Sequence, residues 1–333
     1  MIHFKHILLT ALLVGAATPA IRPCTSCIST RNTPILWKHR DTGAPHNFLA
    51  NHPATDSTYE YIALHNQGDT LGLEAWIGMN RAGLAIMNTA SYNLAPDTAT
   101  LKDREGIIMT LALQHCATVS DFARLLDSLP RPLGVQANFG VIDATGEAAY
   151  FETSGHHATR FDVDPQTTMV RTNYSHSGSS SGRLGVAREK VARLYLDNRT
   201  DLTPRYLTDT LSSCFYDIST STDILAGSDT IVPDKGDYIP RYISTASIAI
   251  EAISSPDGDG SHYVMWTRLG YPPTSETYAV TFDSIPDALL PDRAGITPAE
   301  LKADKAKAAI YHRGKSGKYR LIDTSRLKKP TQH

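Results

Sequence analysis

Two cysteines close to the start of the chain, Cys24 and Cys27, are the side chains best suited to chemistry. Such a pair serves as a disulfide or redox centre, as half of a zinc site, or as a source of a nucleophilic thiol. Residues 28–37 have the pattern of a β-hairpin, and strand positions three apart face opposite ways, which disfavours a bond between the two thiols. Zinc needs a second ligand pair, and the other two cysteines stand alone. The third interpretation is that Cys24 becomes the first residue of the mature chain and acts as a nucleophile.

An N-terminal cysteine carries a nucleophile and a base on one residue. The reference pKa of an α-amine is about 7.7–8.0, so a useful fraction is unprotonated at neutral pH. That amine can take the proton of its own thiol, and the thiolate is the reactive form. Such a design needs no histidine partner, and the thirteen histidines of the chain form no distinctive motif.

The first twenty residues indicate how Cys24 could become N-terminal. Residues 1–20 contain a short basic start, an apolar stretch from Ile7 to Ala17 and a small-residue exit, which together are typical of a secretory signal peptide. Its removal leaves residues 21–23 as a short pro-segment. We expect that step to be self-catalysed, because Pro23 is a poor residue for signal peptidase to cut after. The mature protein is expected to be secreted or periplasmic, where thiols tend to oxidise.

Composition limits the remaining classes of function. The chain has 333 residues, of which 41% are apolar and 20% charged, so it can bury a full core. A net charge of −2 argues against a nucleic-acid partner, and no apolar run reaches the length that spans a bilayer once the leader is removed. We expect a small-molecule substrate, and assembly into a homo-oligomer is left open. Residues 24–333 are expected to form a single domain with a basic extension from about residue 297.

The periodicity predicts helices among short strands. Helices are expected over 103–116, from Thr118 or Ser120 to a stop at Pro130, over 184–196 with Val191, Leu194 and Tyr195 inward, and over 299–310. Short strands lie at 60–65 and 73–78. Antiparallel hairpins interrupted by helix pairs predict an α+β layered fold.

Several motifs together resemble a known superfamily. They are Cys24-Thr25-Ser26 followed by Leu36–Asp41, then Gly78–Ile86, Asn138–Glu152, Val170–Asn173 and Trp266–Pro272. In this order they resemble the N-terminal-nucleophile hydrolases, and within them the branch of penicillin and bile-salt (choloylglycine) hydrolases, acid-ceramidase-like amidases and acyl-coenzyme A:isopenicillin N acyltransferase. The resemblance implies a four-layer αββα sandwich with the nucleophile at one end of a sheet.

The resemblance also implies an activity and a set of site residues. The activity is cleavage of linear, non-peptide amide C–N bonds through a thioester on Cys24, by an amidohydrolase or acyltransferase that uses no metal or organic cofactor. Arg40 lies sixteen residues after Cys24, as the family arginine does, and is expected near the thiolate. Asp41 is expected to contact the α-amine, and Asn173 to hold the oxyanion.

Two further assignments rest on spacing. Asn88 lies roughly where the family places another asparagine. The family's arginine and aspartate are usually three residues apart, whereas Arg40 and Asp41 are neighbours and should face opposite ways on a strand. Lys38, which shares a face with Arg40, is therefore an alternative for the arginine role.

Two rival functions stay open from sequence. A dipeptidase of the related cysteine-nucleophile branch shares the Cys-Thr opening. A non-enzymatic exported binding protein, with a structural Cys24–Cys27 disulfide, requires no nucleophile at all.

Overall fold

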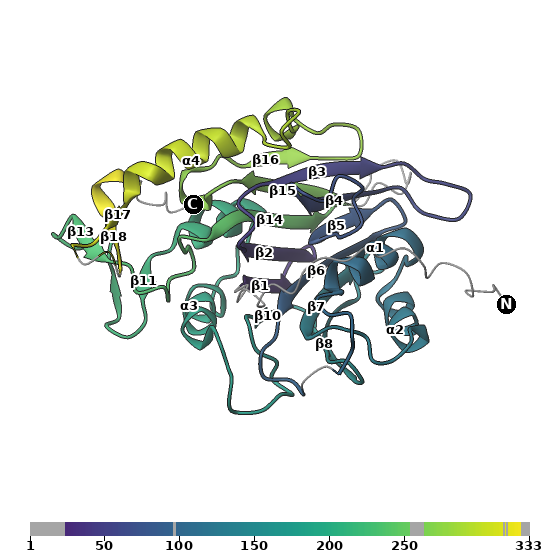
Figure 1. Ribbon diagram of the computed structural model, residues 1–333. Coiled ribbons are helices and arrows are strands. Elements are labelled where there is room, and N and C mark those ends of the chain that lie inside the picture. Colours follow the sequence, from purple (N-terminus) through teal and green to yellow (C-terminus); the bar gives the residue numbers. More distant parts are fainter. Residues whose placement is uncertain (1–23, 96–97, 254–262, 316, 318, 328–333) are drawn as a thin grey trace.

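Two antiparallel sheets lie face to face at the centre of the molecule (Figure 1). The computed structural model describes residues 24–95, 98–253, 263–315, 317 and 319–327, so the expected leader and pro-segment, residues 1–23, lie outside the described residues. In strand order, the first sheet consists of β10 (Thr168–Arg171), β1 (Cys24–Ser29), β2 (Ile35–Asp41), β14 (Ser244–Ala252), β15 (Tyr263–Leu269) and β16 (Tyr278–Val280). The second consists of β3 (Asn47–His52), β4 (Tyr61–Asn66), β5 (Ile77–Asn80), β6 (Leu84–Ala90), β7 (Ala137–Asp143), β8 (Ala148–Thr153) and β9 (Ala158–Asp162).

Apolar side chains from the facing sides of both sheets form the central core. Ile28 and Leu36 of the first sheet pack in one cluster with Ile62 and Met79 of the second. The two outer faces are covered by helical segments. Helices α1 (Glu105–His115) and α2 (Val119–Ser128) pack on the second sheet, and α3 (Val186–Leu196) with a π-helical turn, η1 (Tyr206–Thr210), packs on the first. The layers therefore run helix, sheet, sheet, helix, and the expected αββα sandwich is confirmed.

The helix ends follow the local signals in the sequence. Thr118 is the N-cap of α2, where its hydroxyl accepts from the N–H of Asp121 and the Asp121 carboxylate accepts from the N–H of Thr118. The expected inward position of Leu194 on α3 is wrong, because its side chain is 55% exposed. The expected strand over 73–78 is shorter in the structure, where β5 begins at Ile77.

Helix α4 (Pro298–Ile310) belongs to the basic C-terminal extension, and it is packed rather than solvated. Ala303 and Ile310 are buried, and the helix lies against β15 and against the three-residue helix η3 (Pro272–Thr274). The two strands after α4, β17 (Tyr311–Arg313) and β18 (Arg320–Asp323), form a small sheet with the earlier strand β13 (Ile231–Pro233), in the order β13, β18, β17. The three-residue helix η5 (Thr324–Arg326) follows β18. The other short elements are β11 (Tyr216–Asp217), β12 (Thr222–Asp223), η2 (Leu211–Ser213) and η4 (Asp287–Leu289).

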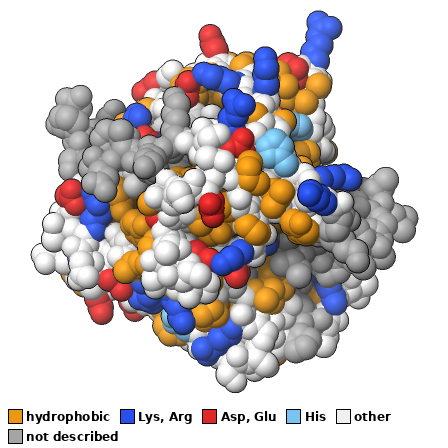
Figure 2. Space-filling view, turned by 90° about the vertical axis from the view of Figure 1, so that its left-hand side faces the viewer, with side chains coloured by type: hydrophobic (Ala, Val, Ile, Leu, Met, Phe, Trp, Pro, Cys, Tyr) orange, Lys and Arg blue, Asp and Glu red, His pale blue; other side chains and the backbone are white. Residues whose placement is uncertain are grey.

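The charge distribution on the end of the molecule that carries this small sheet is mixed. In Figure 2, Lys and Arg side chains lie among Asp and Glu side chains and are not gathered into a patch of one sign. Within the residues that the structure describes, no helix is long and apolar enough to cross a membrane.

Candidate active site

Cys24 is the first residue of β1, and the strand's alternation fixes the direction of its side chain. Ser26 and Ile28 face the second sheet, where the Ser26 hydroxyl lies 3.1 Å from the Tyr150 hydroxyl. Thr25 and Cys27 face the opposite layer, which holds α3. Cys24 therefore shares the face of Ser26 and lies at the end of the space between the sheets. Its side chain is almost buried, with 5% of the residue exposed.

Three groups surround the polar atoms of Cys24. Its backbone N–H donates to Oδ1 of Asn173 at 2.8 Å. Its Sγ lies 3.8 Å from the backbone carbonyl oxygen of Asp41, and its own carbonyl accepts from the guanidinium of Arg188. Residue 23 precedes Cys24 in this chain, so the nitrogen is an amide here and would become an amine only after cleavage before Cys24. The site thus holds both the nitrogen and the sulfur of the expected nucleophile.

Arg188, from the first turn of α3, is a site residue that the sequence analysis missed. Its guanidinium donates to the carbonyl of Cys24, to Oγ1 of Thr25 at 2.9 Å and to Oδ1 of Asn173 at 2.6 Å. The side chain is buried, which lowers the pKa of the guanidinium, and the neighbouring Asp41 opposes that shift. Gly185 permits this approach, because a Cβ there would lie 2.4 Å from the Arg188 guanidinium.

A signal for Arg188 was present in the sequence. Arg188 precedes Val191 and Ala192 by three and four residues, and all three lie on the buried stripe of α3. A charged residue on an apolar helix stripe requires a partner in the core.

Arg40 lies directly across from Cys24 in the pairing of β1 with β2. Cross-strand neighbours of this kind have Cβ atoms about 5 Å apart. The guanidinium contacts the side-chain oxygens of Asn47 and Asn66, and it lies over the ring of Trp76 at 5.2 Å. A cation therefore faces the same space as the thiol.

Lys38 lies one pair farther along β2, across from Ser26 rather than from Cys24. Its ammonium donates to the carbonyl of Trp76 at 2.7 Å and to Oδ1 of Asn88 at 2.6 Å. The geometry thus favours Arg40 over Lys38 as the arginine beside the nucleophile. It also places Asn88 inside β6, where its side-chain oxygen accepts from Lys38.

Asp41 differs from the expectation, because Asn173 and not the Asp41 carboxylate binds the nitrogen of Cys24. Strand alternation turns the carboxylate of Asp41 to the face away from the Cys24 side chain. There its Oδ1 accepts from the Ser244 hydroxyl at 2.5 Å, and its Oδ2 lies 3.9 Å from Arg241 and accepts no hydrogen bond from any described residue. Burial raises the pKa of Asp41 to about 6, against the opposing pull of Arg188 and Arg241.

Asn173 follows β10 and connects three parts of the site. Its Oδ1 accepts from both Cys24 and Arg188, and its Nδ2 donates to the backbone carbonyl of Ala90 at 3.0 Å. An amide N–H of Asn173 was expected to hold an oxyanion. In the structure Nδ2 donates one of its two protons to the Ala90 carbonyl at the end of β6. Only the other proton could serve an oxyanion.

His39 is buried on the same side of β2 as Asp41, and it is a second residue absent from the expected site. Its Nε2 lies 2.9 Å from the Ser244 hydroxyl. Because that hydroxyl gives its one proton to Asp41, Nε2 must donate to Ser244, which assigns the tautomer. Burial lowers the pKa of His39 to about 3, so the imidazole is neutral at physiological pH.

The four cysteines are unbonded, and all are buried. Cys27 lies in the cluster between the first sheet and α3, on the face opposite to Cys24, so the alternative of a Cys24–Cys27 disulfide does not fit the strand geometry. Burial raises the pKa of the thiols of Cys27, Cys116 and Cys214, which makes them poor nucleophiles.

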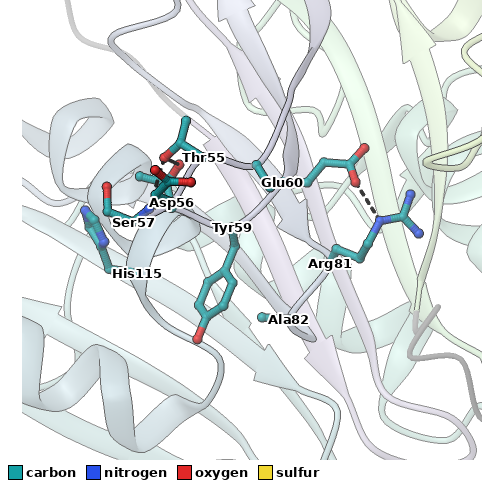
Figure 3. A pocket seen from close by; sticks show the side chains of 10 residues that line it. Thr55, Asp56, Ser57, Tyr59, Glu60, Arg81, Ala82 and His115 are labelled. Carbon is teal, nitrogen blue, oxygen red and sulfur yellow. Dashed lines mark hydrogen bonds and ion pairs between the residues drawn. The ribbon is translucent and has the colours of Figure 1, made fainter.

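A wide hollow of about 620 Å³ lies elsewhere, between the β3–β4 loop and the turn that joins β5 to β6 (Figure 3). The hollow lies at the end of the second sheet where His52 pairs with Tyr61. Arg40 contacts the opposite end, where Asn47 pairs with Asn66. Two of the charged side chains that line the hollow, Arg81 and Glu60, are paired with each other at 2.6 Å, and no thiol lines it. Among the described residues, no three His, Cys, Asp or Glu side chains converge to hold a metal ion.

Comparison with known proteins assigns the chain to a family. No curated protein matches it. Three solved structures are similar: a Caenorhabditis elegans N-acylethanolamine-hydrolyzing acid amidase ortholog (14% identity, covering 72% of this chain and 98% of that one, TM-score 0.44), a variant of conjugated bile acid hydrolase from Clostridium perfringens (10%, 79% and 94%, 0.43) and penicillin V acylase from Agrobacterium tumefaciens (12%, 79% and 87%, 0.42). These TM-scores are all below 0.5, so the overall likeness is loose. The family model of acyl-coenzyme A:6-aminopenicillanic acid acyl-transferase matches residues 30–200 of the 333, and the chain belongs to that family.

Proposed function

We propose that this protein is an exported enzyme that cleaves linear, non-peptide amide C–N bonds with Cys24 as its nucleophile. The observation that carries the proposal is the enclosure of Cys24: Asn173 binds its nitrogen, Arg188 binds its carbonyl and Arg40 lies across from it. Cations near a thiol favour the thiolate, which is the reactive form. Membership of an acyltransferase family supports acyl transfer as the type of reaction.

The proposed reaction begins with transfer of the Cys24 thiol proton to the α-amine of the same residue. The thiolate attacks the amide carbonyl carbon, a C–S bond forms, and the carbonyl oxygen becomes an oxyanion. In this proposal the Nδ2 proton of Asn173 that Ala90 does not use, together with a backbone N–H, stabilises that charge. When the oxyanion collapses, the C–N bond breaks and the leaving amine takes a proton from the α-ammonium.

The second half of the reaction releases the acyl group. The α-amine takes a proton from water, the hydroxide oxygen attacks the thioester carbonyl, and the C–S bond breaks to give a carboxylic acid and the thiolate. If an amine attacks in place of water, a new amide forms and the enzyme is an acyltransferase. The family match favours this second candidate, and adding an amine acceptor and identifying the products distinguishes the two.

The mechanism requires that Cys24 become N-terminal. We propose that the leader, residues 1–20, is removed on export to a secreted or periplasmic location. The pro-segment, residues 21–23, is then removed by the thiol of Cys24 itself. The mature single domain starts at Cys24 and includes α4.

The test is the intact mass, N-terminal sequence and amidase activity of the exported protein and of two variants. Cys24→Ala should retain residues 21–23 and lose turnover of N-acyl amides. Cys27→Ala is the matched control, because it removes a buried thiol three residues away on the opposite face, and it should be processed and active. A wild-type chain that stably begins before Cys24, or a Cys24→Ala variant with unchanged turnover, refutes the proposal. A parallel dipeptide panel tests the dipeptidase alternative.

A further inference from the structure

A small pocket of about 190 Å³ adjoins the site, and the proposed reaction leaves it unused. It begins at Thr42, the residue after Asp41, whose carbonyl oxygen contacts the Cys24 thiol at 3.8 Å. Neighbouring Cα atoms are about 3.8 Å apart, so the pocket opens within a few ångströms of that contact. Its walls come from the end of β2, the start of β14, the end of β15 and α4, through Thr42, Gly43, Pro45, Tyr242 to Thr245, Gly270, Tyr271, Asp304 and Lys307.

The first functional group of the pocket is the ammonium of Lys307, which α4 supplies. It lies over two aromatic rings, 4.4 Å from the centroid of Tyr242 and 5.4 Å from that of Tyr271. Among the described residues it has no ion pair and no hydrogen bond, so its three N–H donors are not committed to a protein acceptor. Partial burial lowers the pKa of Lys307, and Asp304 and Asp41 oppose that shift.

The second group is the hydroxyl of Thr245, which is buried and has no hydrogen-bond partner among the described residues. Thr245 is the extra residue of a β-bulge, because Ser244 pairs with Asp41 and Ala246 already pairs with Arg40. Bulges next to active sites redirect a side chain. A buried hydroxyl without a partner costs stability, so its presence in a pocket lining needs an explanation.

We propose that this pocket is a subsite for a carboxylate of the substrate, held by Lys307 and Thr245 while the scissile amide lies at Cys24; this rests on the proposed function. Lys307 donates to the carboxylate as a charge-assisted pair, and the Thr245 hydroxyl gives it a further hydrogen bond. Liquid water occupies about 30 Å³ per molecule, so the pocket has room for about six atoms of that size, enough for a carboxylate and a short stem.

The charges around the pocket are consistent with an anionic occupant. Arg241 lies in the adjoining loop, and Arg320 lies 3.8 Å from the ring of Tyr242. Two acidic groups also act on Lys307: Asp41 accepts a hydrogen bond from Ser244, and Asp304 lies 3.7 Å from His46, which pairs with it when the imidazole is protonated. The extension that sequence composition marked only as basic thus places a cation beside the active site.

The first experiment compares matched substrates. N-hexanoylglycine carries the carboxylate on the amine side, hexanedioic acid monomethylamide carries it on the acyl side, and the glycinamide and methyl-ester analogues are the neutral partners. Lys307→Met should raise KM for one of the two acids about 10- to 100-fold, and it should leave kcat for that acid and the KM of the neutral analogues unchanged. The acid that is affected shows whether the pocket binds a carboxylate on the acyl side or on the amine side of the scissile amide. Thr245→Val should raise the same KM several-fold, and Lys307→Arg should retain most of the preference.

The control is Lys302→Met, which removes an exposed lysine of the same helix that is paired with Glu276. It should leave every KM unchanged. Equal effects of Lys307→Met on acids and neutral analogues overturn the subsite.

The second experiment does not depend on turnover. N-bromoacetylglycine and N-bromoacetylglycinamide alkylate a thiol and differ only in the carboxylate, and intact mass measures the rate at Cys24. The acid should react faster with the wild type, and Lys307→Met should reduce that advantage about 10-fold. If no amide is cleaved but the advantage depends on Lys307, the proposed function fails and the subsite stands. If amides are cleaved and neither reagent nor substrate distinguishes Lys307→Met, the subsite fails alone.

Discussion

Arg188 holds the two halves of the site together. It contacts the carbonyl of Cys24 on β1 and the side-chain oxygen of Asn173, which follows β10. It therefore fixes the distance between Cys24 and the residue that binds its nitrogen. A buried guanidinium is stabilised only where acceptors surround it. Arg188 therefore has a positioning role, and it acts through Asn173 and the backbone of Cys24.

Replacing Arg188 should reduce activity more than it reduces folding. We expect Arg188→Lys to lower kcat about 100-fold, because an ammonium cannot span the acceptors that the planar guanidinium reaches. The variant should keep a native circular dichroism spectrum and lose about 2–3 kcal/mol of unfolding free energy.

Arg193→Lys is the matched control, since Arg193 lies on the same helix, is exposed, and pairs with Glu189 outside the site. It should be fully active. An active Arg188→Lys enzyme would contradict the assigned role.

The elements show which parts of the fold local sequence can encode. Helix α2 starts at a Thr118 capping box and ends before Pro130, and alternation identified the β1–β2 hairpin, because these signals lie within a few residues. The pairing of β2 with β14 joins residues about 200 positions apart, and no local pattern encodes it.

The same limit explains what was missed in the site. The proposed nucleophile, Cys24, could be identified because it follows a leader-like segment. The partner of its nitrogen could not be found, since whether Asp41 or Asn173 contacts that nitrogen depends on how β10 pairs with β1. Arg188 was overlooked because its acceptors, two on β1 and one after β10, are brought to α3 only by the fold.

Helix α4 is attached to the sandwich by a carboxylate whose titration should be visible in stability. Glu300 completes the capping box with Thr297 and also accepts from the N–H of Asn47 at 2.6 Å. Burial raises the pKa of Glu300 from 4.5 to about 7. The native chain thus holds this proton more tightly than the unfolded chain does, so stability from this group is complete below about pH 4.5 and is lost as the pH rises to about 7.

The expected result is a fall of about 3 kcal/mol in unfolding free energy across that interval, and Glu300→Gln should remove it. Glutamine is also a good capping-box residue, so the helix end is preserved. Urea unfolding at pH 5, 6, 7 and 8 measures the slope. Asp41 contributes in the same direction up to about pH 6, so the wild type and the variant must be compared directly. Glu276→Gln at the surface should leave the slope unchanged, and equal slopes for wild type and Glu300→Gln would exclude the linkage.

At the scale of the molecule, the site is assembled from segments that lie far apart in the sequence. Cys24, Arg40, Asn173 and Arg188 meet only when β1 is paired on both sides and α3 is docked on the first sheet. Chemistry that needs all four groups is therefore available only to a folded chain.

This predicts when the proposed removal of residues 21–23 can occur. Full-length chain purified in 8 M urea should show no cleavage before Cys24, and dilution into buffer should start cleavage with first-order kinetics that follow the recovery of tryptophan fluorescence. The rate should be independent of protein concentration, because each molecule processes itself. Cleavage in urea, or a rate that rises with concentration, would point to a separate protease.

The position of β1 has a practical consequence for handling the mature protein. Chain ends usually fray, but Cys24 starts a strand that lies between β10 and β2, and only 5% of it is exposed. A mature N-terminus at this position would be poorly placed for an aminopeptidase, and a purification tag fused to it would turn the α-amine that the proposed reaction uses as a base into an amide. Labels and immobilisation anchors therefore belong at exposed loop residues far from this strand, such as those of the β3–β4 loop.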